Sequence, residues 1–285
     1  MPAPMRSWLF VPGENDRMMA KAPTLTADII VFDLEDAVAP QRKEAARQLV
    51  RRTIETGGLQ ARVYVRLNGL HTGMTRQDIE SVVVPGLSGV MLPKAEGPGE
   101  LKGLDTLLRE AEEDAGIQPG TLEVAALVET PTGVLNAHTI ALSSRVVALA
   151  LGGEDLAAAL GAERTQLAPE LLYARGRVVM AAAAATIQAI DTVWVDVRDD
   201  ESLRKEACFV RNLGFTGKLA IHPRQVPIIN EAFSPSEEEL TQAARIAEAF
   251  NASDAGVVTV DGKMVDEPVV RRARRLLALA SRDGR

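Results

Sequence analysis

Eight short apolar runs of the kind that form β-strands recur along this 285-residue chain, and a stretch with helical character follows each one. The runs cover residues 8–11, 29–34, 63–67, 90–92, 124–128, 146–151, 193–197 and 219–221. Alternation of strand and helix is typical of parallel α/β proteins, and eight such units are the number that closes a barrel. We therefore predict a single α/β domain, a (β/α)8 TIM barrel, over residues 1–233.

The alternation stops near Phe233, and the remaining residues are surplus to an eight-unit barrel. Residues 236–251 and 267–281 have helical patterns. The apolar run 257–260 between them is followed by Asp261 and Gly262, which favours a small hairpin. We predict a C-terminal helical extension over residues 234–285. It either packs on its own barrel or covers the active site of a neighbouring subunit.

Composition narrows the class of partner. The net charge of −7 argues against nucleic acid, although local cations or a metal ion can still attract a small anionic substrate. The single cysteine, Cys208, excludes an intrachain disulfide and suits a reducing cytosol, and we expect it to be buried. No signal-peptide pattern is present. The alanine-rich stretch 178–190, which we assign to a helix over 169–190, is shorter than the roughly 20 residues of a membrane span. We predict a cytoplasmic protein without membrane contact.

Most residues capable of chemistry stand at or just after the end of an apolar run. They are Asp33, Glu35, Asp36, Arg66, Asn68, Lys94, Glu129, Glu154, Asp155 and His222. In a barrel of parallel strands all these ends meet on one face, around one cavity. The sequence therefore predicts a single site from residues that are widely separated along the chain.

Glu129 and Asp155 are the best candidates for metal ligands. They follow the adjacent fifth and sixth strands, so their carboxylates can converge. Two carboxylates completed by water and substrate oxygens are a common way to hold Mg²⁺. The alternative is that Glu129 caps a helix start and Asp155 is a helix N-cap. Gly152 and Gly153, which stand just before Glu154 and Asp155 in the sixth unit, allow the backbone to pass close to a ligand.

Arg66 and Lys94 are the candidate cations. Arg66 can bind a substrate carboxylate through two parallel hydrogen bonds, or form a buried ion pair with Asp33, Glu35 or Asp36. For Lys94 we prefer a charge role, or a salt bridge within the acidic ring, to a Schiff-base role. Glu35 and Asp36 would bind Arg66, Lys94 or a metal-bound water, unless Asp36 is only a solvated helix cap.

Two further positions are less specific. His222 could be a catalytic base, but a histidine that hydrogen-bonds the backbone and shapes its loop is the preferred interpretation. The turn at Gly13 could approach a phosphate group. No GxGxxG or GxxxxGK[ST] motif is present, so no dinucleotide or P-loop site is predicted.

Seven motifs together resemble the citrate lyase β-subunit family, which belongs with the HpcH/HpaI aldolases and the malyl-CoA and citramalyl-CoA lyases. They are RSWLFVPG (6–13), DLEDAV (33–38), RLN (66–68), PK (93–94), ETP (129–131), GGEDL (152–156) and GKLAIHPRQ (217–225). The resemblance covers essentially the whole chain, with the motifs in the family's order.

The resemblance implies a TIM barrel assembled as a homotrimer or hexamer, with Mg²⁺ held by Glu129 and Asp155. It implies that Arg66 grips the substrate carboxylate, beside Gly153 and Glu154. Coenzyme A, as part of the substrate, would lie near Gly13, Lys218 and His222. The reaction would be the reversible cleavage of a 3-hydroxyacyl-CoA to acetyl-CoA or propionyl-CoA and an α-keto acid. Asp266 matches a C-terminal aspartate that serves as acid/base in relatives, from a neighbouring subunit.

Three other functions remain open on the sequence. The chain could be the β subunit of a multi-subunit citrate lyase, with the thioester on an acyl carrier protein. It could be a metal-dependent pyruvate aldolase, but that class keeps a histidine near its first strands, and no histidine precedes His71. It could also be a non-catalytic barrel that binds a keto acid or a partner protein.

Overall fold

The computed structural model describes residues 5–166, 168–253 and 256–280. Contacts among the described residues define two compact units, one within residues 5–230 and one within residues 231–280. The division falls inside helix α9 (Gln225–Phe233), a little before the predicted boundary after Phe233. Within the described residues, no helix combines the length and the apolar character needed to cross a membrane.

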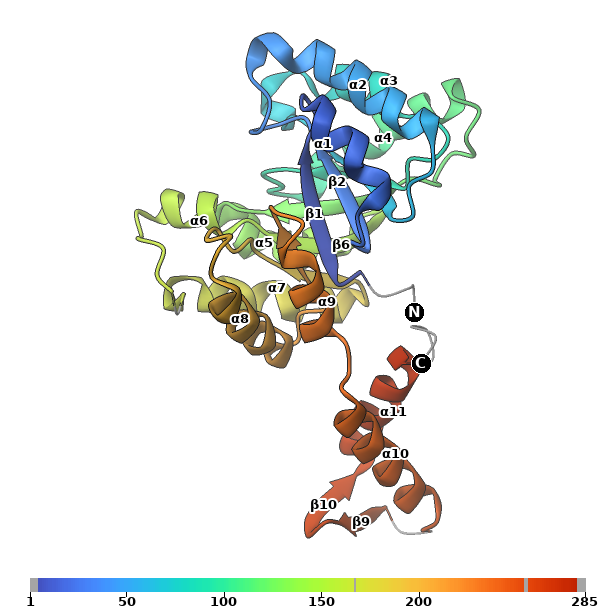
Figure 1. The fold of residues 1–285 in the computed structure, drawn as a ribbon, viewed down its shortest axis with the longest axis vertical. Coiled ribbons are helices and arrows are strands. Elements are labelled where there is room, and N and C mark those ends of the chain that lie inside the picture. Colours follow the sequence, from blue (N-terminus) through green and yellow to red (C-terminus); the bar gives the residue numbers. More distant parts are fainter. Residues whose placement is uncertain (1–4, 167, 254–255, 281–285) are drawn as a thin grey trace. The chain divides into compact units, whose positions relative to one another are not determined.

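The first unit is a closed barrel of eight parallel strands, as predicted (Figure 1). The strands are β1 (Ser7–Pro12), β2 (Ile29–Asp33), β3 (Arg62–Arg66), β4 (Gly89–Leu92), β5 (Glu123–Val128), β6 (Val146–Leu151), β7 (Gln188–Asp191) and β8 (Gly217–Ala220). Each strand pairs with the next, and β8 returns to pair with β1, so the barrel leaves no free edge.

Helices connect the strands and lie outside the barrel (Figure 1). They are α1 (Asp16–Lys21), α2 (Lys43–Thr56), α3 (Thr75–Val82), α4 (Pro98–Asp114), α5 (Pro131–Ala141), α6 (Gly153–Leu160), α7 (Leu172–Ala185), α8 (Asp200–Leu213) and α9. Several begin where the sequence contains a helix-start signal. Thr130 caps α5 by accepting from the Gly133 N–H, and Pro131 occupies the first turn, where its missing N–H has no cost.

The seventh strand lies earlier than predicted. Helix α7 ends at Ala185, Thr186 takes a left-handed conformation, and β7 is Gln188–Asp191 instead of residues 193–197. The prediction was wrong because β7 has only two apolar side chains, whereas the run that contains Val193 and Val195 looks more strand-like. The polar end of β7 is tolerated because the buried Asp191 carboxylate pairs with Arg175 of α7.

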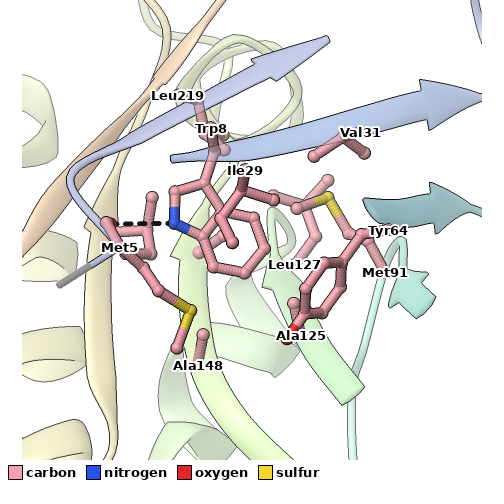
Figure 2. Close-up of a cluster of buried hydrophobic side chains, with 12 residues drawn as sticks. Met5, Trp8, Ile29, Val31, Tyr64, Met91, Ala125, Leu127, Ala148 and Leu219 are labelled. Atoms are coloured by element: carbon pink, nitrogen blue, oxygen red, sulfur yellow. Dashed lines mark hydrogen bonds between the residues drawn. The ribbon is translucent and has the colours of Figure 1, made fainter. Parts of the chain in front are cut away.

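The barrel interior is filled by apolar side chains from every strand (Figure 2). They are Met5, Trp8, Ile29, Val31, Tyr64, Met91, Ala125, Leu127, Ala148, Ala150, Ile190 and Leu219. The rings of Trp8 and Tyr64 lie 4.9 Å apart with 55° between their planes, and small residues at 125, 148 and 150 leave room for them. The buried indole N–H of Trp8 donates to the Met5 carbonyl. The interior is therefore a packed core, which leaves the strand ends to form a site.

The C-terminal unit contains α10 (Glu237–Asn251), the hairpin strands β9 (Val257–Val260) and β10 (Lys263–Asp266), and α11 (Glu267–Ala280). The predicted hairpin is confirmed, and Asp261 and Gly262 both have positive φ, as a tight I′-type turn requires. Helices α10 and α11 lie side by side (Figure 1). The apolar side chains of Val260, Val265 and Val270 form the core of this unit.

One expectation about packing fails. Cys208 lies on α8 of the barrel unit and is exposed, whereas we expected a buried residue. The neighbours Ala207 and Val210 occupy the buried stripe of α8 instead. At 3.6 residues per turn, the position after Ala207 points away from the barrel.

Candidate active site

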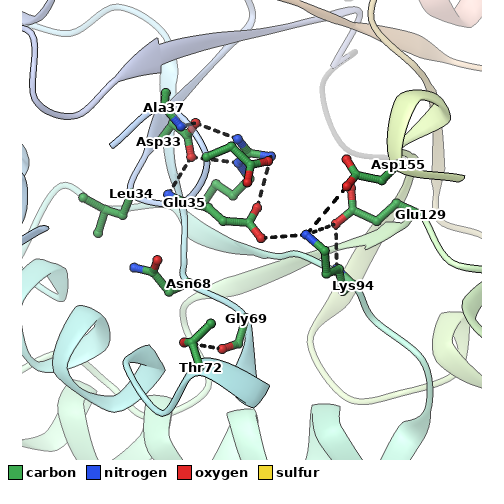
Figure 3. A network of polar contacts seen from close by, with 12 residues as sticks. Asp33, Leu34, Glu35, Ala37, Asn68, Gly69, Thr72, Lys94, Glu129 and Asp155 are labelled. Carbon is green, nitrogen blue, oxygen red and sulfur yellow. Dashed lines mark hydrogen bonds and ion pairs between the residues drawn. The ribbon is translucent and has the colours of Figure 1, made fainter. Parts of the chain in front are cut away.

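Charged side chains gather at the carboxyl ends of β2 to β6 (Figure 3). Asp33 ends β2 and pairs in register with Arg66 at the end of β3. Lys94 follows β4, Glu129 directly follows β5, and Asp155 lies in the first turn of α6. Residues predicted from five separate βα units therefore lie on one face of the barrel.

The Lys94 ammonium lies among three carboxylates. Its Nζ is 3.0 Å from Oε1 of Glu35, 3.8 Å from Oε1 of Glu129 and 3.9 Å from Oδ1 of Asp155 (Figure 3). Burial lowers the pKa of Lys94, but the three acids outweigh burial, so the pKa is raised overall. A Schiff-base lysine needs a neutral amine, whereas Lys94 is held as a cation. This supports the predicted charge role.

Glu129 is almost completely buried, with 2% of its surface exposed. Burial raises its pKa to about 8, and the negative charges of Glu35 and Asp155 act in the same direction against the influence of Lys94. A further cation beside Glu129 would favour the ionised carboxylate. The chemistry of this acidic pair therefore suits a divalent cation between Glu129 and Asp155.

Water and substrate would have to supply the remaining ligands of such a cation. Among the described residues, no three His, Cys, Asp or Glu side chains converge as a metal-ligand set. Glu129 and Asp155 provide carboxylate oxygens, which are the ligands that Mg²⁺ prefers. A site with few protein ligands leaves coordination positions open for a substrate.

Arg66 is held by carboxylates on several sides. Its Nε and Nη2 donate to the two oxygens of Asp33, at 2.7 and 2.6 Å. Its Nη1 lies 3.1 Å from Oε2 of Glu35 and 3.4 Å from Oδ2 of the exposed Asp36. The guanidinium carbon is 4.9 Å from the centre of the Phe10 ring, a cation–π contact. The buried ion pair considered from the sequence is present, and the edge of Arg66 that a ligand could use is the one now facing Asp36.

Glu35 connects the two cations of the site. Its Oε1 accepts from Lys94 and its Oε2 forms the ion pair with Arg66. Burial raises the pKa of Glu35, and the charges of Arg66 and Lys94 counteract the effect only in part. The buried ammonium of Lys43 fixes the backbone here, because it donates to the carbonyls of Leu34 and Glu35 at 2.6 Å each. Sequence reasoning missed Lys43, although a lysine on the inner face of a helix beside a strand end was a usable signal.

The loop after β6 leaves no room for a side chain at either of its two glycines, Gly152 and Gly153. A Cβ on Gly152 would overlap Oε2 of Glu129, and a Cβ on Gly153 would lie 2.8 Å from Oγ1 of Thr192. The glycines thus let the backbone pass close to a metal-ligand candidate and to β7. Glu154, predicted to bind substrate, has its Oε1 bound by Nε of Arg164 at 2.8 Å.

Lys218 does not occupy a coenzyme-binding position, which corrects the prediction. It is completely buried, and its Nζ donates to Asp191, Glu206 and the Thr192 carbonyl, at 2.7 Å each. All three ammonium donors are used, so none remains for a phosphate group. The sequence could not reveal this, because these partners come from elements that are distant along the chain.

The Gly13 turn also serves a structural purpose. The Gly13 N–H donates to the carbonyl of Asp33 at 2.9 Å, and a Cβ there would lie 2.7 Å from the same oxygen. This backbone N–H is therefore already used and is not free to bind a phosphate group. His222 is exposed, and its Nδ1 accepts from the Arg224 N–H at 3.2 Å, which supports the loop-shaping interpretation.

Asn68 and Asp266 each have a local hydrogen-bond partner. Asn68 is buried, and both its backbone N–H and its amide donate to Oδ2 of Asp78, so it shapes the loop after β3. Asp266 belongs to the C-terminal unit, where its Oδ1 accepts from the Val269 N–H in the first turn of α11. Its acid/base role stays a prediction.

Known proteins resemble this chain over nearly its full length. It is 38% identical to the citrate lyase subunit beta of Leuconostoc mesenteroides subsp. cremoris, over 97% of this chain and 93% of that protein. It is 33% identical to the mitochondrial citramalyl-CoA lyase of Rattus norvegicus, over 98% of this chain and 86% of that protein. A crystal structure of CitE from Mycobacterium tuberculosis with magnesium, acetoacetate and coenzyme A superimposes with a TM-score of 0.82 at 33% identity, covering 98% and 99% of the two chains.

The family model described as HpcH/HpaI aldolase/citrate lyase matches residues 6–223. This range contains the whole barrel and every residue of the charged cluster at its carboxyl end. On the family match, the full-length relatives and the closed barrel, this chain belongs to the HpcH/HpaI aldolase/citrate lyase family of carbon–carbon lyases.

Proposed function

We propose that this protein is a Mg²⁺-dependent lyase that cleaves or forms a 3-hydroxyacyl thioester such as citryl-, malyl- or citramalyl-CoA. The products of cleavage are acetyl-CoA, or propionyl-CoA, and an α-keto acid such as oxaloacetate, glyoxylate or pyruvate. The observation that carries the proposal is the convergence of Glu129, Asp155, Lys94 and Arg66 at one end of the barrel. The citrate lyase and citramalyl-CoA lyase relatives, and the CitE complex with magnesium, acetoacetate and coenzyme A, support this substrate class.

In this proposal Glu129 and Asp155 hold the metal ion, with water and substrate oxygens as the other ligands. Bound magnesium supplies Lewis acidity, which polarises a carbonyl group and stabilises negative charge on its oxygen. The Lys94 ammonium, 3.8 Å from Glu129 and 3.9 Å from Asp155, adds a fixed positive charge to the same region. A preorganised charge of this kind acts strongly in a site that excludes water.

Arg66 is proposed to orient the keto-acid carboxylate. Asp33 and Phe10 hold the guanidinium in place, so its outer edge is already aimed when a ligand arrives. The substrate carboxylate would replace the Asp36 carboxylate, which is 61% exposed and only 3.4 Å from Nη1. Fixing the substrate in this way supplies much of the entropic advantage of the reaction.

Asp266 is proposed to transfer the proton of the acetyl methyl group, from its own subunit or from a neighbouring one in a trimer or hexamer. Such an acid/base contributes about 10²–10⁴ in rate. Asp266→Asn should therefore bind a keto acid like the parent but lose turnover. Mixing Asp266→Asn and Glu129→Gln subunits should restore activity if the two residues act across an interface.

The decisive experiment compares cleavage of citryl-, malyl- and citramalyl-CoA in the presence of Mg²⁺ and in the presence of EDTA. Cleavage that requires Mg²⁺ and is absent in Glu129→Ala and Asp155→Ala is the expected result. Cleavage that persists in EDTA, or magnesium-dependent oxaloacetate binding that survives either substitution, would contradict the proposal. Binding of keto acids without turnover of any thioester would indicate a non-catalytic barrel.

The second candidate is the β subunit of a multi-subunit citrate lyase, which the 38% identity to the Leuconostoc subunit favours. The chemistry at Glu129 and Asp155 would be the same, but the thioester would be carried by an acyl carrier protein. Supplying citryl groups on a carrier protein and on free CoA separates the two candidates. A strong preference for the carrier-bound substrate would identify the subunit.

A further inference from the structure

Four charged side chains from β7, β8, α7 and α8 are buried together. Arg175 of α7 and Lys218 of β8 pair with Asp191 of β7 and Glu206 of α8, and none of the four is more than 7% exposed. The two positive and two negative charges balance. Burying four charges rarely adds net stability compared with apolar residues, so the cluster calls for another explanation.

One hydrogen bond connects this cluster, through Thr192, to the loop that carries the metal-ligand candidate Asp155. Two of the Lys218 donors go to Asp191 and Glu206, and the third goes to the carbonyl of Thr192 at 2.7 Å. Thr192 directly follows β7 and is 1% exposed. Lys218 therefore fixes the backbone of a residue at the carboxyl end of the barrel.

The hydroxyl of Thr192 in turn holds the start of α6. Its Oγ1 accepts from the Gly153 N–H at 2.8 Å. Gly153 is the first residue of α6, whose N-cap, Gly152, has no side chain to satisfy the free N–H groups. Thr192, from the loop after β7, thus caps the start of α6.

The position of this helix start decides where Asp155 lies. Asp155 is two residues after Gly153, in the first turn of α6. On the other side, a Cβ on Gly152 would overlap Oε2 of Glu129. The two glycines are therefore enclosed between Glu129 and Thr192, so a shift of either neighbour moves Asp155 relative to Glu129.

We propose that Thr192 is a positioning residue for the metal site: its hydroxyl, held in place by Lys218, sets the separation of the Glu129 and Asp155 carboxylates. The inference rests on the proposed function, because it assigns Thr192 a role towards the magnesium ion of that function. In this proposal Thr192 is not itself a ligand of the metal ion or of the substrate.

The test measures Mg²⁺ affinity by calorimetric titration of MgCl₂ into the substrate-free protein. Thr192→Val keeps the shape of the side chain but removes the acceptor of the Gly153 N–H, and should weaken Mg²⁺ binding by about 10- to 100-fold, the usual effect of losing a residue that orients a ligand. Thr192→Ser keeps the acceptor and should remain close to the parent.

Thr216→Val is the matched control. Its hydroxyl also contacts backbone, donating to the carbonyl and accepting from the N–H of Ala189 in β7, but it precedes β8 at the opposite end of the barrel. This variant should lose stability without losing Mg²⁺ affinity. If Thr192→Val does not fold, Thr192→Ala, which cannot overfill the site, should show the same loss of affinity.

The outcomes separate the inference from the proposed function. Parent-like Mg²⁺ affinity in Thr192→Val or Thr192→Ala, together with loss of binding in Glu129→Gln, would overturn the role of Thr192 and leave the function intact. Equal weakening in Thr192→Ser and Thr192→Val would also overturn it, because the hydroxyl would then not matter. A parent protein that binds no Mg²⁺ would overturn both.

Discussion

Lys94 and Glu129 are joined through two different groups of the lysine. The Lys94 backbone N–H donates to Oε1 of Glu129 at 2.8 Å, and the ammonium of the same residue lies 3.8 Å from the same oxygen. Lys94 reaches this geometry in a left-handed backbone conformation, with φ of 51°, which is uncommon for a residue other than glycine. The backbone just after β4 thus takes a conformation in which it binds the Glu129 carboxylate.

This relationship predicts the effect of changing Lys94. Lys94→Met removes the positive charge but keeps the backbone N–H that holds Glu129, and we expect turnover to fall about 10²-fold, as for the loss of one preorganised electrostatic group. Lys94→Arg keeps the charge and should retain more activity. Steady-state kinetics of the two variants tests whether Lys94→Arg is more active than Lys94→Met. Mass spectrometry after borohydride treatment with pyruvate should show no adduct, whereas an adduct on Lys94 would establish a Schiff base instead.

Arg66 should not be replaceable by lysine. Lysine carries the same charge but lacks the planar guanidinium group. That group pairs with Asp33 through Nε and Nη2 and leaves the Nη1 edge for a ligand carboxylate. Arg66→Lys is therefore expected to weaken magnesium-dependent pyruvate binding by about tenfold or more, on the order of one lost charged hydrogen bond. Isothermal titration calorimetry measures the affinity.

Arg62→Lys provides the control for Arg66. Arg62 starts the same strand, β3, and pairs with Glu123 at the opposite end of the barrel, 2.8 Å away. The control should bind pyruvate as the parent does. Weakening of the same size in both variants would show that a general disturbance of β3, and not the loss of a carboxylate-binding edge, explains the result.

Gly152 should not tolerate a side chain. Gly152→Ala places a methyl group against the Glu129 carboxylate, and overpacking of this kind costs about 1–3 kcal/mol. Both the free energy of unfolding and the Mg²⁺ affinity should fall. In Gly103→Ala the added methyl group meets open space within α4, so stability should rise by about 0.5–1 kcal/mol with unchanged Mg²⁺ affinity. Chemical denaturation and calorimetry compare the two; a Gly152→Ala protein with parent stability would show that the loop relaxes away from Glu129.

The raised pKa of Glu129 makes the stability of the metal-free protein depend on pH. The folded protein keeps a proton on Glu129 up to about pH 8, whereas the unfolded chain loses it near the ordinary glutamate pKa of 4.5. Between these values the folded state binds more protons, so the stabilising contribution is complete below the lower pKa and is lost as pH rises through the higher one.

In EDTA, the free energy of unfolding should therefore fall as pH rises from about 5 to 8, and Glu129→Gln should show a shallower slope. Urea denaturation at several pH values measures both slopes. Glu35, whose pKa is also raised, contributes in the same direction in both proteins, so the difference between them isolates Glu129. Identical slopes would show that Glu129 is ionised in the folded, metal-free protein.

The sequence by itself determined the barrel and which charged residues meet at one end of it. Apolar runs and the charged residues that end them are local patterns, and closure of eight parallel strands brings Glu129, Asp155 and Arg66 to one face without further information. The position of β7 was not predicted, since this four-residue strand ends in Asp191, and the Arg175 and Lys218 side chains that pair with its carboxylate come from other elements.

Only the tertiary structure decided what each charge does. Lys218, predicted to lie near coenzyme A, donates instead to Asp191, Glu206 and the Thr192 carbonyl. Lys43, for which no role was predicted, holds the backbone of Leu34 and Glu35. The role proposed for Thr192 depends on contacts with Lys218 and Gly153, which are far from it along the chain. The physical reason is that strand and helix patterns depend on neighbours in the sequence, while the burial and pairing of a charge depend on partners that folding brings together.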